Sequence, residues 1–194
     1  MKKYITFIIV LLFFSGSMES LYAQNDPAFY LKIKDASGND QLLGICSREA
    51  LLQAPFVNWF QQNYNGYIVD SFTCKFVEPL LRDKKITIFL GTWCGDSKRE
   101  VPRLLKMLDC CNFPPAQLEL IMVSNQDSIY KQSPLHEESG RNIVRVPTVI
   151  IEEAGKEMGR IVEYPVVSLE KDMLRILRND KYIPSYNTLR VGAR

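Results

Sequence analysis

A strand–helix–strand pattern in the middle of the chain restricts the possible folds more than any other feature. The apolar run "KITIFLGT" (residues 85–92) has the composition of a buried strand, and "QLELIMVS" (117–124) repeats it. Between them, "SKREVPRLLKMLD" (97–109) has the spacing of an amphipathic helix, whose inner face would carry Val101, Leu104, Leu105 and Leu108. Two buried strands connected through a helix predict an α/β fold with both strands in one sheet.

The segments that follow extend this sheet. "TVIIEE" (148–153) and "KEMGRIVEY" (156–164) have the pattern of paired strands, joined by a turn at "EAGK". "SLEKDMLRILRN" (168–179) is typical of an amphipathic helix capped by Ser168. The polar stretch 125–142 indicates little regular structure beyond one short helix. Together these segments predict a mixed sheet with helices on both faces.

The N-terminal part of the chain predicts further elements. "AFYLKIKD" (28–35) alternates as a strand does, "SGND" predicts a turn, and "SREALLQ" (47–53) predicts a short helix with Ser47 at its N-cap. Pro55 is expected to begin a second helix, ending near residue 66. The aromatic residues of this stretch are interpreted as core packing; they are Phe56, Trp59, Phe60 and Tyr64.

A third helix is expected after Asp70 or Ser71, either of which suits its N-cap, with Pro79 as an interruption. Its apolar residues form two adjacent stripes, Phe72, Phe76 and Leu80 beside Cys74, Val77 and Leu81. The chain is therefore predicted to divide into a leader (1–23), an N-terminal extension of a strand plus helices (24–69), an α/β domain (70–179) and a C-terminal tail (180–194).

The first residues indicate export. Lys2 and Lys3 precede the apolar run 4–14, and Ala23 suits the last position before cleavage. This pattern is typical of a secretory signal peptide, and the alternative is an N-terminal anchor that stays uncleaved. We expect a periplasmic or secreted protein, without membrane attachment after signal cleavage, in a compartment where disulfides persist.

Composition excludes several classes of partner and site. The formal net charge is only +2, which argues against nucleic acid as a partner because phosphate binding needs a basic surface. His136 is the one histidine, in a polar stretch, and no two cysteines have CxxC spacing, so no zinc site is expected. The sequence indicates neither a metal nor a cofactor.

The stretch "GTWCGDSKREVP" (91–102) contains the candidate reactive residue, Cys94. Cys94 lies where the first buried strand passes into the helix, and unpaired backbone N–H groups at a helix N-terminus favour a thiolate. Lys98 adds a positive charge, and the Ser97 hydroxyl is expected to donate a hydrogen bond to the sulfur. Asp96 opposes both effects, because a carboxylate disfavours a neighbouring anion.

These motifs resemble the thioredoxin superfamily over residues 70–179. Trp93-Cys94-Gly95 is similar to the start of its active-site motif, and Lys98 and Pro102 to its lysine and helix-kinking proline. "RVPT" (145–148) is similar to the loop that carries the family's cis-proline, and "EAGKEMGR" (153–160) to its last hairpin. The resemblance implies a thioredoxin-like mixed sheet flanked by helices. It also implies that Trp93 and cis-Pro147 border a substrate site and that the Val146 backbone pairs with an extended substrate segment.

Three positions depart from the family's pattern. Ser97 replaces the second cysteine, Asp96 replaces a proline, and Ile88 stands where a buried carboxylate is usual. A single nucleophilic Cys94 predicts a mixed disulfide that persists until another thiol attacks it. This suits disulfide isomerisation, monothiol exchange or covalent capture, with protein or low-molecular-weight thiols and disulfides as partners. The alternative is a non-catalytic binding module that captures extended peptide segments.

The other cysteines have structural or redox interpretations. Cys46, at a predicted helix start, is either a distant resolving thiol or a small core residue. Cys74 is expected in the core, and Cys110 and Cys111 at a helix end, where a bridge between such neighbours would be strained. Because the chain has five cysteines, at least one thiol is free or pairs between molecules.

Overall fold

The computed structural model describes residues 30–35 and 37–186, so the expected leader, the start of the extension and the end of the tail lie outside the described residues. In the described residues the strands are β1 (Tyr30–Lys34), β2 (Asp40–Cys46), β3 (Lys84–Leu90), β4 (Leu118–Met122), β5 (Thr148–Glu153) and β6 (Lys156–Val162). The α-helices are α1 (Arg48–Leu51), α2 (Val57–Gly66), α3 (Ser71–Val77), α4 (Gly95–Cys110) and α5 (Leu169–Leu177), and short 3₁₀ turns occupy Glu78–Leu80, Pro115–Gln117 and Asp127–Ile129.

The strands form one mixed sheet in the order β1-β2-β4-β3-β5-β6. β3 and β4 run parallel, with Leu90 opposite Met122, and α4 connects them as the sequence predicts. Every other neighbouring pair is antiparallel, including the β5–β6 hairpin. The expected fold class, a mixed α/β sheet flanked by helices with an N-terminal extension, is confirmed.

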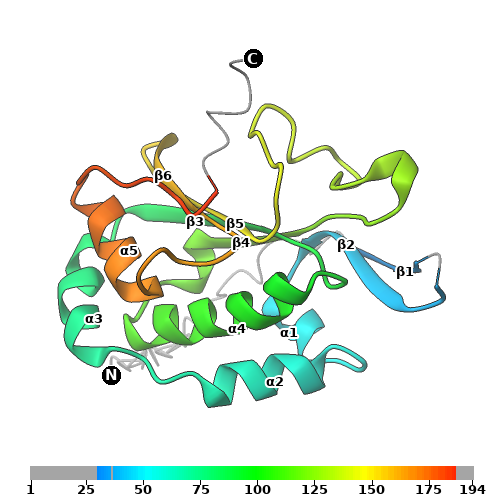
Figure 1. The fold of residues 1–194 in the computed structure, drawn as a ribbon, viewed down its shortest axis with the longest axis horizontal. Helices are drawn as coiled ribbons and strands as arrows, with labels where there is room; N and C mark the ends of the chain where they lie inside the picture. The colour runs from blue at the N-terminus through cyan, green and yellow to red at the C-terminus, as the bar shows by residue number, and fades with distance from the viewer. Residues whose placement is uncertain (1–29, 36, 187–194) are drawn as a thin grey trace, which may run out of the picture.

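The main core lies between the sheet and the helices. Successive side chains of a strand point to opposite faces, so Ile86, Ile88 and Leu90 of β3 all face the helices. They pack with apolar residues from α3, α4 and α5, including the expected inner face of α4 and the Met173, Ile176 and Leu177 face of α5. All five α-helices lie on this side of the sheet (Figure 1).

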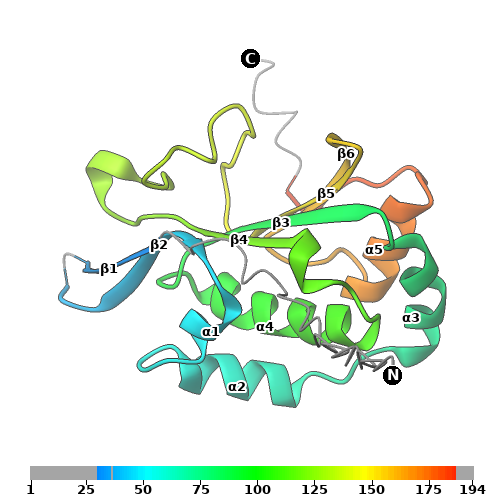
Figure 2. The same cartoon turned by 180° about the vertical axis from the view of Figure 1, so that it is seen from behind.

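The expectation of helices on both faces is therefore wrong. The second face carries a smaller core built from Phe89, Ile121, Val123, Val146 and Ile150. The connection from β4 to β5 covers this face as an extended, largely irregular segment (Figure 2). Residues 125–142 are polar, as the sequence shows, and lack the amphipathic stripe that a covering helix would need.

The N-terminal extension joins the same sheet and core. β1 is the expected strand, but β2 was not predicted, and it pairs antiparallel with β4 through Gly44, Ile45 and Cys46. Its sequence "DQLLGIC" includes a glycine and has no clear alternation of polar and apolar residues, so the pattern predicted no strand. In the structure Gly44 has a φ of 95°. The helices expected at 47–53 and after Pro55 are present as α1 and α2, and Phe56 and Phe60 are buried as expected.

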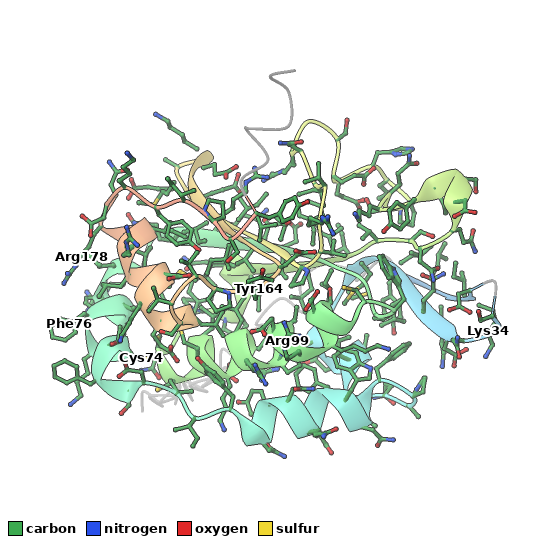
Figure 3. All side chains as sticks on the ribbon, in the orientation of Figure 1. Lys34, Cys74, Phe76, Arg99, Tyr164 and Arg178 are labelled. Carbon is green, nitrogen blue, oxygen red and sulfur yellow. The ribbon has the colours of Figure 1, made fainter. Side chains whose placement is uncertain are left out.

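Within α3, packing against α5 separates the two expected stripes. Cys74, Val77 and Leu81 are buried, whereas Phe72 and Phe76 are 70% and 44% exposed and contact each other edge to face. Figure 3 shows Phe76 at the outer edge of α3. Asp70 is the N-cap, as expected, and accepts a hydrogen bond from the Thr73 amide.

Candidate functional site

The site lies at the carboxyl end of β3, where the strand passes into α4. Leu90 ends the strand, the Cys94 amide donates to the Gly91 carbonyl at 2.9 Å, and α4 begins at Gly95. Cys94 is thus the N-cap residue, and its carbonyl accepts the first helical hydrogen bond, from the Lys98 amide, at 3.0 Å. The amides of the first turn have no acceptor within the helix, so they present positive partial charge at this end.

The thiol of Cys94 faces the loop before β5. Its Sγ donates a hydrogen bond to the Val146 carbonyl at 3.2 Å, and the thiol remains half-buried. The Val146–Pro147 peptide bond is cis, and both residues are buried. The structure therefore brings together three residues that the sequence placed in one site, Cys94, Val146 and Pro147, although Cys94 lies more than fifty positions before the other two.

Trp93 is held on the second face of the sheet. Its Nε1 donates to the Val123 carbonyl at 2.8 Å, and its ring lies 5.9 Å from that of Tyr130. A Cβ atom at Gly91 would lie 2.5 Å from Trp93 Cε2, so the indole occupies the space that Gly91 leaves open. Trp93 borders the same small core as Cys94, and the half-exposed Tyr130 lies on the other side of the contact with Trp93.

Ser97 does not have the expected partner. It is fully buried, and its Oγ accepts a hydrogen bond from the Gly91 amide at 3.2 Å. Among the described residues no hydrogen bond joins Ser97 to the sulfur of Cys94. Because the first turn of α4 directs this side chain toward the strand end, Ser97 fixes the turn that carries Cys94.

Of the charged residues at the start of α4, Asp96 forms an ion pair and Lys98 forms none within the described residues. Asp96 pairs with Arg99 at 2.7 Å, so the carboxylate faces a cation on its own helix. Arg99 also pairs with the buried Glu100, and this hydrogen bond raises the pKa of the Arg99 guanidinium against the lowering effect of burial. Lys98 forms no ion pair with any residue in the described part of the chain, so its charge is not neutralised.

Cys46 lies in a different core from Cys94. It ends β2 with 5% of its surface exposed and packs in the core on the helical face. Cys94 instead borders the smaller core on the opposite face. Burial raises the pKa of the Cys46 thiol to about 12, and its position in the core on the helical face separates it from Cys94.

Sequence reasoning missed the residues that support Trp93. Tyr130 comes from the segment that was predicted to have little structure, and the Val123 carbonyl comes from the end of the strand predicted at 117–124. One sequence feature could have indicated the close packing of Trp93: Gly91, a glycine between the strand and this bulky aromatic residue. The described residues contain no cluster of three or more potential metal ligands, and none of their helices is long and apolar enough to cross a membrane.

Comparison with known proteins leaves the family open. No model of a protein family matches the chain, and no curated protein matches it. Among solved structures, a protein of unknown function from Pseudomonas aeruginosa is similar at 15% identity and a TM-score of 0.44, covering 63% of this chain and 81% of that chain. An HIV epitope-scaffold is similar at 16% identity and a TM-score of 0.44, covering 64% and 84%.

Proposed function

We propose that this chain is a thioredoxin-superfamily protein that carries out thiol–disulfide exchange through a single nucleophile, Cys94. The contact between Cys94 Sγ and the Val146 carbonyl carries the proposal. It places a half-buried thiol at a helix N-terminus and directly beside a buried proline loop. The order β4-β3-β5-β6, with β3 and β4 parallel, also supports the superfamily assignment.

The proposed reaction is a displacement at sulfur. The Cys94 thiolate attacks one sulfur of a partner disulfide, a bond forms between Cys94 and that sulfur, and the second sulfur leaves as a thiolate. The first-turn amides of α4 favour the attacking anion, and so does Lys98, which has no ion pair among the described residues. Loss of the thiol proton also frees the Val146 carbonyl, because only the protonated sulfur donates to it.

The freed carbonyl suggests how a partner is held. Among the described residues the Val146 amide has no hydrogen-bond acceptor, so amide and carbonyl can both pair with an extended partner segment, as an added strand does. Trp93 packs against the small core that contains Val146, and Tyr130 lies beside Trp93. We propose protein or low-molecular-weight disulfides as partners, in the cell envelope or outside the cell, in keeping with the signal-peptide pattern.

The arrangement favours a lasting adduct. Ser97 occupies the resolving position, and its oxygen is committed to the Gly91 amide. No thiol of the described residues other than Cys94 borders the second-face core, so release requires an outside thiol. A monothiol exchange or isomerase role therefore fits better than a dithiol reductase role.

The adduct is the first test. Incubation with glutathione disulfide at neutral pH should add one glutathione to Cys94, located by peptide mass, and Cys94→Ala should remove that adduct completely. Cys46→Ala is the matched control, because this buried thiol should leave the adduct unchanged. An unmodified Cys94 in the folded wild-type protein would contradict the proposal.

Ser97→Cys is the second test. A thiol at this position should attack the Cys94 adduct and release the partner, so insulin reduction driven by dithiothreitol should rise well above the wild-type rate. Ser97→Ala is the control, since it removes the hydroxyl without adding a thiol and should give no such gain. If Ser97→Cys folds and neither traps nor reduces disulfides, a non-catalytic module that binds extended segments becomes the better account.

A further inference from the structure

Three cysteines gather at the opposite end of α4 from Cys94. Cys110 is the last residue of the helix and Cys111 its C-cap. Cys74 comes from the middle of α3, where Figure 3 labels it. Cys111 Sγ donates to the Cys74 carbonyl at 3.9 Å and lies 3.7 Å from Met107 Sδ. Because α4 has 16 residues, this group lies about 24 Å along the helix from Cys94.

The three thiols differ in exposure. Cys74 and Cys111 are 3% and 1% exposed, whereas Cys110 is exposed to solvent. Burial raises the pKa of the Cys111 thiol to about 11, although its hydrogen bond with Cys74 acts to lower it. Burial also raises the pKa of the Cys74 thiol. Of the three thiols, therefore, only Cys110 meets an outside reagent directly.

We propose that these residues form a second redox site, in which a disulfide closes between Cys74 and Cys111 and Cys110 is the entry thiol. A direct Cys110–Cys111 bond is disfavoured, because a bridge between adjacent residues is strained. Cys74, in contrast, lies on the neighbouring helix with its carbonyl 3.9 Å from Cys111 Sγ. The site is independent of the function proposed for Cys94.

The chemistry balances with a small-molecule disulfide as oxidant. The Cys110 thiolate attacks the external disulfide, forms a mixed disulfide and releases one thiolate. Cys74 then attacks the Cys110 sulfur, which releases the second external thiolate and leaves a Cys74–Cys110 bond. Finally Cys111 attacks Cys74, and Cys110 returns to a thiol. Two protein thiols have lost two electrons and two protons, and one external disulfide has become two thiols.

The bond would tie α3 to the end of the helix that carries the exchange site. It closes the chain from residue 74 to residue 111, a segment that includes β3 and the whole of α4. A cross-link of this kind restricts the unfolded chain and so stabilises the fold. We expect the oxidised protein to unfold at least about 5 °C above the reduced protein.

The test uses the full chain with Cys94→Ala, so that its outcome does not depend on the first site. The protein is incubated with glutathione disulfide to equilibrium, quenched with acid, and alkylated in denaturant without reduction. Peptide mapping should give a linked peptide containing Cys74 and Cys111, with Cys46 and Cys110 alkylated. The rise in unfolding temperature should disappear with dithiothreitol.

Two variants separate the roles. Cys111→Ser should abolish the linked peptide, and Cys110→Ser should slow its formation at least about tenfold while leaving its final amount unchanged, because the buried pair loses its exposed entry. Alkylation of all three thiols after equilibration of the Cys94→Ala protein, or a glutathione adduct that remains on Cys110, would overturn the proposal. An unchanged rate in Cys110→Ser would overturn the entry role. If Cys111→Ser fails to fold, the Cys94→Ala protein, which keeps Cys74, Cys110 and Cys111, still tests whether the linked peptide forms.

Discussion

At the scale of single residues, the proposed exchange site depends on the lack of a side chain at Gly91. Gly91 sits between the strand end and the Trp93 indole, and its amide donates to the buried Ser97 hydroxyl. The Gly91 amide therefore stabilises the turn that carries Cys94, and the lack of a Cβ atom at Gly91 leaves space for the Trp93 ring. The indole then reaches the Val123 carbonyl on the neighbouring strand's extension.

Gly91→Ala should displace Trp93. The added Cβ would meet Trp93 Cε2 at 2.5 Å, and such overpacking costs about 1–3 kcal/mol of the free energy of unfolding. We expect a lower unfolding temperature, altered tryptophan fluorescence and slower adduct formation at Cys94. Gly95→Ala is the control, since a Cβ there has no neighbour within 4 Å. Equal effects of the two substitutions would show that crowding at Trp93 is not the cause.

At the scale of elements, the helix starts differ in how their backbone is satisfied. Ser168 accepts a hydrogen bond from the Lys171 amide at 3.2 Å and so caps α5. Ser47 occupies the same position at α1, yet its side chain makes no capping bond. The sequence predicts both serines as caps, and only the geometry separates them.

Ser168→Ala should therefore lower the free energy of unfolding by about 1 kcal/mol, because one amide of α5 loses its acceptor. Ser47→Ala should change it by less than half as much. Urea unfolding of the two variants and the wild type measures both values. A larger loss for Ser47→Ala would mean that the two caps have been assigned in the wrong order.

At the scale of the whole molecule, the carboxylate of Asp109 is one of the polar links between the N-terminal extension and α4. Asp109, near the end of α4, accepts hydrogen bonds from Arg48 at 2.8 and 2.7 Å and from Tyr64 at 2.6 Å. Burial acts to raise the pKa of Asp109, but the bonds from Arg48 and Tyr64 outweigh it and hold the pKa below its ordinary value. These contacts connect α4 to α1 and α2.

A lowered pKa in the folded state predicts how this contribution depends on pH. It is present above the unfolded pKa of about 4 and is lost as the pH falls through the lower folded value. Asp109→Asn should therefore lower the unfolding temperature at pH 7, and the difference from wild type should narrow at about pH 3. Asp180→Asn, at an exposed carboxylate without an ion pair to any described residue, is the control. A difference that stays constant with pH would show that the charge of Asp109 is not responsible.

Local patterns in the sequence determined the strands β3 to β6, the helices α4 and α5, and the position of Cys94 at a helix start. These features depend on the spacing of apolar residues within a single segment, so they can be read without knowing what lies opposite. The grouping of Cys94 with Val146 and Pro147 came from motif resemblance, and the structure brings these residues together.

Only the tertiary structure decided which contacts form between distant segments. β2 exists because β4 offers an edge to pair with, and the loop before β5 replaces a helix because its polar residues cannot supply an apolar stripe. Ser97 bonds to Gly91 rather than to Cys94, since the first turn of α4 points it at the strand end. Cys74, Cys110 and Cys111 come together because α3 packs beside the end of α4. The spacing of residues along the chain does not distinguish between these possible contacts. Strand pairing and helix packing determine which contact forms, so these outcomes depend on the fold and not on the sequence pattern.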